Sequence, residues 1–173
     1  MSAVDWSGGS QSLKSWKNIR RKLTSDLSDI EHLIHVVNFW SQCPISRRFL
    51  DWDKPEQWLD PWQLMHQNNF DECAISLGMF YTLLLSADGR WNSERLKLML
   101  FKNQHEQFQG IVLEVDRKWL LNYEYNTVCN RLLVNSGFSI QQRYAYDNGQ
   151  FSICNLHLIS GCADSNTNLT TVN

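Results

Sequence analysis

The sequence lacks several features that would assign it to a class at once, and the first is a close cysteine pair. Its five cysteines, at positions 43, 73, 129, 154 and 162, form no C-x-x-C motif, which excludes a zinc knuckle and a thioredoxin-type redox pair. No window contains about 18 consecutive apolar residues, so no membrane-spanning helix is predicted. The N-terminus has no apolar segment of the secretory type. We therefore expect reduced thiols in a cytoplasmic compartment, without secretion through a signal peptide.

The sequence also lacks a strong charge of either sign. Its formal net charge is −2, so the global balance implies neither nucleic acid nor an anionic membrane as a partner. One segment is different: residues 14–22 read KSWKNIRRK, and five of these nine residues are basic. This segment predicts either a contact with nucleic acid or an acidic partner, through Lys17, Arg20 and Arg21, or simply the solvated face of a helix.

Length and composition predict one folded domain. The chain has 173 residues, of which 43% are hydrophobic and 12% aromatic, enough to form a substantial core. Residues 1–13 are polar and rich in glycine and serine, which predicts a flexible arm. Residues 160–173 form a polar tail, so we expect a single globular domain over residues 14–159.

Helices are predicted in the first half of the chain. Ser28 and Glu31 have the spacing of a capping box, and apolar residues recur at helical spacing behind them. Asp60 followed by Pro61 marks a second helix start. A third helix over residues 73–85 is apolar almost all round, which predicts burial on most sides. Its Gly78 lowers helix propensity by about 1 kcal/mol, which indicates close packing against a neighbour.

Strands are predicted in the second half. The residues Asn148 and Gly149 are the strongest hairpin signal in the chain. Helices followed by strands predict an α+β fold, in which N-terminal helices and a buried central helix pack on an antiparallel β-meander. The expected strands are residues 97–101, 110–115, 119–125, 141–146 and 150–158.

Cys73 is the one residue with the setting of a nucleophile. A cysteine near the start of a buried helix gains thiolate character from the helix dipole. A histidine from a strand would take its proton, and a third polar group would orient that histidine. The segments DPWQLMHQNNFDECAISLGMFYTLLL, GIVLEV and WLLNYEY resemble the core of transglutaminase-like and papain-like cysteine enzymes.

That resemblance implies specific roles. Cys73 would be the nucleophile, Asn122 the orienting residue, and the base would open the GIVLEV strand. Gln109 and Gly110 stand at that opening, so His105, a few residues upstream, is the remaining candidate base. Glu72 places a negative charge beside the thiol, which raises the thiol pKa and opposes activation. On this ground the sequence favours a core cysteine over a catalytic one.

A second resemblance covers three other motifs, Trp58–Leu64, Leu77–Leu83 and Leu120–Tyr123. They are similar to small proteins of T4-like tailed bacteriophages, especially those of cyanobacteria. The resemblance implies a phage origin and a role in the virion or in the cytoplasm of the infected host. It implies no reaction.

Three hypotheses follow. The first is a non-catalytic structural or interaction protein of a tailed phage, at the head–tail junction, the tail or the baseplate, whose partners are phage or host proteins. Trp52, Trp58 and Trp62 are then contact residues or core. The second is a cysteine-dependent acyl-transfer enzyme, a transglutaminase or a protease, using Cys73. The third is a nucleic-acid-associated module using residues 14–22. None of the three calls for a cofactor, a metal or a membrane, and the sequence leaves the oligomeric state open.

Overall fold

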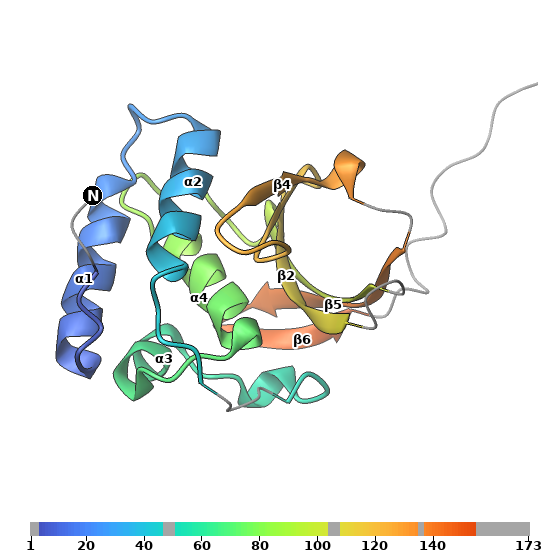
Figure 1. Ribbon diagram of the computed structural model, residues 1–173, viewed down its shortest axis with the longest axis horizontal. Coiled ribbons are helices and arrows are strands. Elements are labelled where there is room, and N and C mark those ends of the chain that lie inside the picture. Colours follow the sequence, from blue (N-terminus) through green and yellow to red (C-terminus); the bar gives the residue numbers. More distant parts are fainter. Residues whose placement is uncertain (1–3, 47–50, 104–107, 135–136, 155–173) are drawn as a thin grey trace, which may run out of the picture.

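The computed structural model describes residues 4–46, 51–103, 108–134 and 137–154. Within these ranges, four α-helices pack against a six-stranded antiparallel sheet (Figure 1), which confirms the predicted α+β class. Figure 1 shows the helices gathered on one side and the sheet curving away on the other. The α-helices are α1 (Gly9–Lys22), α2 (Asp29–Trp40), α3 (Pro61–Gln67) and α4 (Glu72–Leu84). The strands are β1 (Leu96–Asn103), β2 (Phe108–Val115), β3 (Trp119–Leu121), β4 (Val128–Asn130), β5 (Phe138–Asp147) and β6 (Gln150–Cys154).

The predicted helix starts are confirmed by their capping contacts. The Ser28 hydroxyl accepts from the Glu31 backbone N–H, and the Glu31 carboxylate accepts from the Ser28 N–H at 2.8 Å. The Asp60 carboxylate accepts from the N–H groups of Trp62 and Gln63, both at 2.8 Å, before Pro61 opens α3. These side chains satisfy N–H groups that have no partner inside the helix.

The N-terminal helix begins earlier than the composition predicted. α1 starts at Gly9 and includes residues assigned to a flexible arm over 1–13. Trp6, still farther upstream, packs its ring 5.7 Å from that of Trp40 and 5.4 Å from that of Phe70. Aromatic packing thus orders a segment whose glycine and serine content suggested flexibility. The predicted tail boundary at residue 160 lies outside the described residues.

α4 is the central helix, and it lies between the other helices and the sheet (Figure 1). Its residues from Cys73 to Leu83 are all buried. The expected close packing at Gly78 is confirmed, because a Cβ placed there would lie 2.2 Å from the Trp40 ring. Only glycine allows α2 and α4 to approach this closely.

The sheet is antiparallel throughout, with the order β4-β3-β2-β1-β5-β6. β5 therefore pairs with β1 and not with β4, its neighbour in the sequence. The predicted strand over residues 119–125 ends at Leu121, because Asn122 takes a left-handed φ of 63°. That conformation is one that asparagine tolerates better than most residues.

The two faces of the sheet differ in what covers them. One face packs against the helices through alternate β2 residues such as Ile111, Leu113 and Val115, which belong to the main core. The other face holds a smaller apolar cluster around Met99 and Phe101. Among the described residues, no helix has the length and hydropathy to cross a membrane.

Candidate functional site

Cys73 lies in the first turn of α4, as the sequence predicted. The Asp71 carboxylate caps this helix by accepting from the Ala74 backbone N–H at 2.6 Å. The cysteine is 7% exposed. Its position at the positive end of the helix dipole favours a thiolate.

The surroundings of Cys73 oppose ionisation. Burial, together with the charges of Asp71 and Glu72, raises the pKa of its thiol to about 12, although the hydrogen bond from the Ile111 backbone lowers it in part. Desolvation and like charge thus outweigh the helix dipole. The cysteine is held as a protonated thiol.

Cys73 belongs to the main buried core, which also includes Tyr144 of β5. The Tyr144 hydroxyl donates to the backbone carbonyl of Trp52 at 3.0 Å, and the Tyr144 ring lies 4.7 Å from the ring of Trp58. The segment that contains these two tryptophans therefore packs against β5 at Tyr144.

Asn122 is brought to the same helix end, but as a structural link. Its side-chain nitrogen donates to the Glu72 carbonyl and to the Ser76 hydroxyl, both at 2.7 Å. Ser76 in turn donates to the Ile111 carbonyl at 2.5 Å. These bonds join the first turn of α4 to β2 and to the end of β3.

The base implied by the resemblance is not part of the described site. His105 lies outside the described residues. The residues that the family pattern places at the base position are Gln109, which is exposed, and Gly110, both near the start of β2. Within the described ranges, no hydrogen bond or ion pair joins a histidine to Cys73.

His32 is a buried histidine, but it lies far from Cys73. His32 accepts from the Trp91 indole N–H through Nδ1 at 3.0 Å, so its Nε2 donates to the Thr24 carbonyl at 2.9 Å. Its Nε2 also lies 3.9 Å from the carboxylate of Asp88, which follows the C-terminal end of α4. Cys73 is at the opposite end of this 13-residue helix, about 20 Å away.

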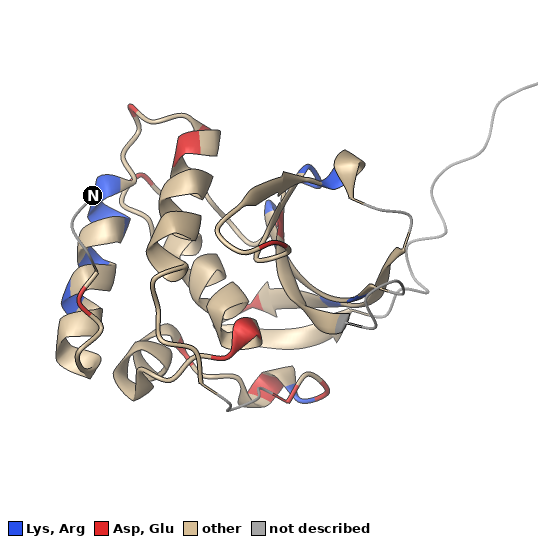
Figure 2. Ribbon diagram, in the orientation of Figure 1, with Lys and Arg blue, Asp and Glu red and all other residues tan. Residues whose placement is uncertain are grey.

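The predicted contact residues separate into two groups. Trp62 is 55% exposed, and the Arg20 guanidinium lies 5.3 Å from its ring and 3.8 Å from that of Trp16. Lys17 and Arg21 are exposed on α1, where Figure 2 shows most of the basic charge of the helical side. These residues share the α1–α3 surface, whereas Trp52 and Trp58 are only partly exposed and pack against the core.

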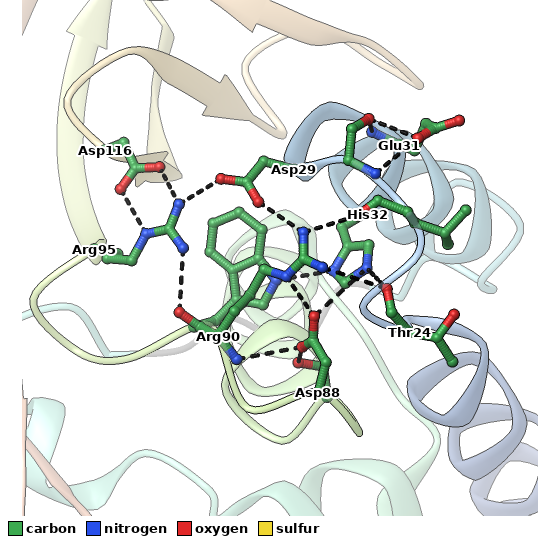
Figure 3. Close-up of polar contacts among 12 residues, drawn as sticks. Thr24, Asp29, Glu31, His32, Asp88, Arg90, Arg95 and Asp116 are labelled. Carbon is green, nitrogen blue, oxygen red and sulfur yellow. Dashed lines mark hydrogen bonds and ion pairs between the residues drawn. The ribbon is translucent and has the colours of Figure 1, made fainter.

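An ion-pair network that the sequence reading missed lies at the N-terminal end of α2 (Figure 3). Arg95 pairs with Asp29 at 2.6 Å and with Asp116 at 2.7 Å. Arg90 pairs with Asp29 at 2.9 Å and also with Asp88. The network joins α2, the α4–β1 loop and the β2–β3 turn. Sequence spacing gave no signal for it, because its members come from segments far apart in the chain.

A pocket of about 130 Å³ opens beside the N-terminal end of α4. It is bounded by the C-terminal half of α2, by α4 and by the loop over residues 122–126. Glu72 lines it, but Cys73 does not. Within the described residues, no group of three or more histidine, cysteine or acidic side chains is arranged to hold a metal ion.

Comparison with known proteins finds solved structures with a similar fold. No protein-family model and no curated protein matches the sequence. Among solved structures, calcium-bound LapG from Legionella pneumophila is similar with a TM-score of 0.63 and 12% identity, over 84% of this chain and 80% of LapG. The EGTA-treated form of LapG gives a TM-score of 0.62 and 13% identity, over 78% and 73%. At this identity the similarity shows the fold alone.

Proposed function

We propose that this protein is a non-catalytic interaction protein that uses a LapG-like fold as a binding frame. The observation that carries the proposal is the state of Cys73, a buried thiol whose pKa is raised to about 12. At pH 7 such a thiol is deprotonated in only about one molecule in 100,000, and the thiolate is the reactive form. A fold that positions Cys73 but keeps its thiol protonated does not provide a reactive nucleophile.

The other residues of the expected site support the same conclusion. Gln109 and Gly110 stand where the resemblance places the base, and the Asn122 side chain braces the first turn of α4 through Glu72 and Ser76. Cys73 itself is only 7% exposed. A substrate carbonyl would need to come within roughly 3–3.5 Å of the sulfur to react.

A second candidate function is cysteine-dependent acyl transfer by Cys73. It is favoured by the fold similarity to LapG, a cysteine protease, together with the position of the cysteine at the start of the central helix. It requires His105 as the base and a movement that uncovers the thiol. The physical state of the described site argues against it.

The partners we propose are proteins of a tailed phage or of its host, on the strength of the three sequence motifs that resemble T4-like phage proteins. The protein would then act in the virion or in the cytoplasm of the infected cell. The α1–α3 surface, with Arg20 and exposed Trp62, offers a further contact area. A nucleic-acid partner at this surface would show steeply salt-dependent binding.

The test replaces Cys73 by alanine in the phage and measures particle yield, with mass spectrometry of purified particles. We expect Cys73→Ala to leave the yield within about twofold of wild type, because small changes in core volume are tolerated when the frame survives. The matched control is Cys43→Ala, which removes another buried thiol. Loss of particles with Cys73→Ala alone, in a variant that folds normally, would establish the acyl-transfer function instead.

A further inference from the structure

The pocket beside α4 has an apolar floor and an acidic rim. Its floor is formed by side chains of α2 and α4, among them Val37, Trp40, Ile75 and Met79. Its rim carries Glu72 from α4 and Glu124 from the loop after β3. Concave sites with mainly apolar walls and a few placed polar groups are the usual form of ligand sites.

The two rim carboxylates are not neutralised by the protein itself. Within the described part of the chain, neither Glu72 nor Glu124 takes part in a salt bridge. Figure 2 shows acidic residues at the first turn of α4 and on the loop that faces it. The Glu124 carboxylate faces the Cys129 thiol, which brings no positive charge. A cation from outside would therefore meet two unpaired negative charges above an apolar floor.

The pocket is held in shape before any ligand binds. Asn122 fastens one end of the loop to the Glu72 carbonyl at 2.7 Å. The Tyr125 hydroxyl fastens its middle to the Ser41 carbonyl at 2.7 Å. Asn122 and Asn126 take left-handed φ values of 63° and 54°, which turn the loop back toward the helices. A preformed site avoids the entropy cost of ordering a loop on binding.

The size of the pocket limits what enters it. Its volume of about 130 Å³ is similar to the roughly 150 Å³ of a cavity that holds one benzene molecule, or six heavy atoms. A lysine side chain has four carbons and one nitrogen beyond its Cα, an apolar stem with a charged tip. A divalent cation alone would leave the apolar floor unused and find too few acidic ligands.

The mouth of the pocket indicates that the ligand belongs to a protein. Ile45 and Tyr125 line it and are 63% and 77% exposed. Large exposed apolar side chains around a pocket are typical of protein contact sites, where a partner covers them. A small free amine would leave both side chains in water.

We propose that this pocket binds the side chain of a lysine presented by a partner protein, with its stem on the apolar floor and its ammonium group between Glu72 and Glu124. The proposal rests on the function proposed above, because it names the kind of contact through which a non-catalytic frame would recognise its partner.

The test is protein-detected NMR titration of the full chain with a pentapeptide, acetyl-Ala-Ala-Lys-Ala-Ala-amide. We expect shifts in residues 122–126 and in the first turn of α4. Matched peptides with norleucine or Nε-acetyl-lysine should bind at least about fivefold more weakly, since they cannot form the ion pairs. Glu72→Gln and Glu124→Gln should each weaken binding of the lysine peptide about threefold. Glu94→Gln, an exposed glutamate outside the pocket, is the control and should leave affinity unchanged.

Several outcomes would overturn the proposal. Equal binding of the norleucine peptide would remove the role of charge, and tighter binding of an arginine peptide would change the residue recognised. If n-butylamine binds as tightly as the peptide, the ligand is a free amine and not a protein. Unchanged affinity in the folded double variant of Glu72 and Glu124 would also refute it. None of these experiments measures the role of Cys73. The lysine site can therefore be refuted without refuting the non-catalytic function proposed above.

Discussion

The hydroxyl of Thr82 is the polar centre of the helical core. It accepts from the indole N–H of Trp16 at 2.8 Å and from that of Trp40 at 2.9 Å, and it donates to the Gly78 carbonyl at 2.6 Å. One side chain of α4 thus satisfies a tryptophan from α1 and a tryptophan from α2. Both indole groups are buried, so each needs a hydrogen-bond acceptor.

Replacing Thr82 by valine keeps the shape and removes this acceptor. Each buried N–H left without a partner is destabilising by roughly 1–3 kcal/mol, so we expect Thr82→Val, which leaves two, to lower the free energy of unfolding by about 2–6 kcal/mol. Urea denaturation measures it. Thr127→Val is the control, because the Thr127 hydroxyl is exposed and bonds only the nearby Tyr125 carbonyl. A loss below about 0.5 kcal/mol with Thr82→Val, the size expected of surface changes, would contradict this role.

At the residue scale, the sequence predicted local contacts well but did not predict contacts between distant segments. The caps at Ser28 and Asp60 and the tight contact at Gly78 follow from local spacing and backbone sterics. The partners of Thr82 and of Arg95 do not, because they come from segments 21 to 66 residues away. Local sequence patterns do not predict such pairs.

At the scale of elements, the network at the start of α2 holds together pieces of both halves of the chain. Burial opposes ionisation of Asp88, but hydrogen bonds from the Arg90 backbone, Ser86 and the Arg90 side chain outweigh it and hold the Asp88 pKa below its ordinary value. Burial likewise opposes ionisation of Asp29, and Arg95 and Arg90 hold its pKa down. Because these pKa values are lower in the folded state, the network stabilises the fold above the unfolded-state pKa of about 3.9.

We therefore expect this stabilisation to be lost as the pH falls below about 4, through the folded-state pKa values. Urea midpoints measured from pH 7 to pH 3 check this. Asp88→Asn should lower stability at pH 7 by about 1.5–3 kcal/mol, the range for hydrogen bonds to charged groups. It should also make the midpoint less sensitive to acid. The exposed Asp147 lies outside the network, so Asp147→Asn is the control, and equal acid sensitivity in wild type and Asp88→Asn would refute the assignment.

Elements themselves were predictable where their signals are local. The apolar run of α4 and the turn at Asn148 and Gly149 gave a helix and a hairpin, and the structure has both. The pairing of β5 with β1 was not predictable, since several antiparallel orders satisfy the same alternation of side chains. The early start of α1 depends on aromatic contacts of Trp6 with distant rings.

At the scale of the whole molecule, the similarity of the fold does not extend to the chemical state of Cys73. The arrangement of α4 and the sheet is similar to that of LapG, yet the cysteine at the helix start is buried, protonated and without a described base. Fold alone does not fix function, which depends on the side chains of the site. The sequence indicated the same conflict, because Glu72 stands beside Cys73 and Gln109 stands where a base is expected.

The lysine pocket fits this view of the molecule. It uses the same helix end and the same loop after β3 that would serve catalysis, with Asn122 as a brace. The Glu72 carboxylate raises the pKa of the Cys73 thiol, and Glu72 also lines the pocket.

The most direct test of the central claim is the rate at which iodoacetamide alkylates Cys73 in the folded protein, followed by mass spectrometry from pH 7 to pH 9. The pKa of about 12 predicts a rate at pH 7 at least about 100-fold below that of a model thiol, whose pKa is about 8.5. It also predicts a rate that still rises tenfold or so with each pH unit up to pH 9, because the thiolate fraction does. Alkylation as fast as the model thiol, or a rate that levels off below pH 8, would show an activated cysteine and contradict the account.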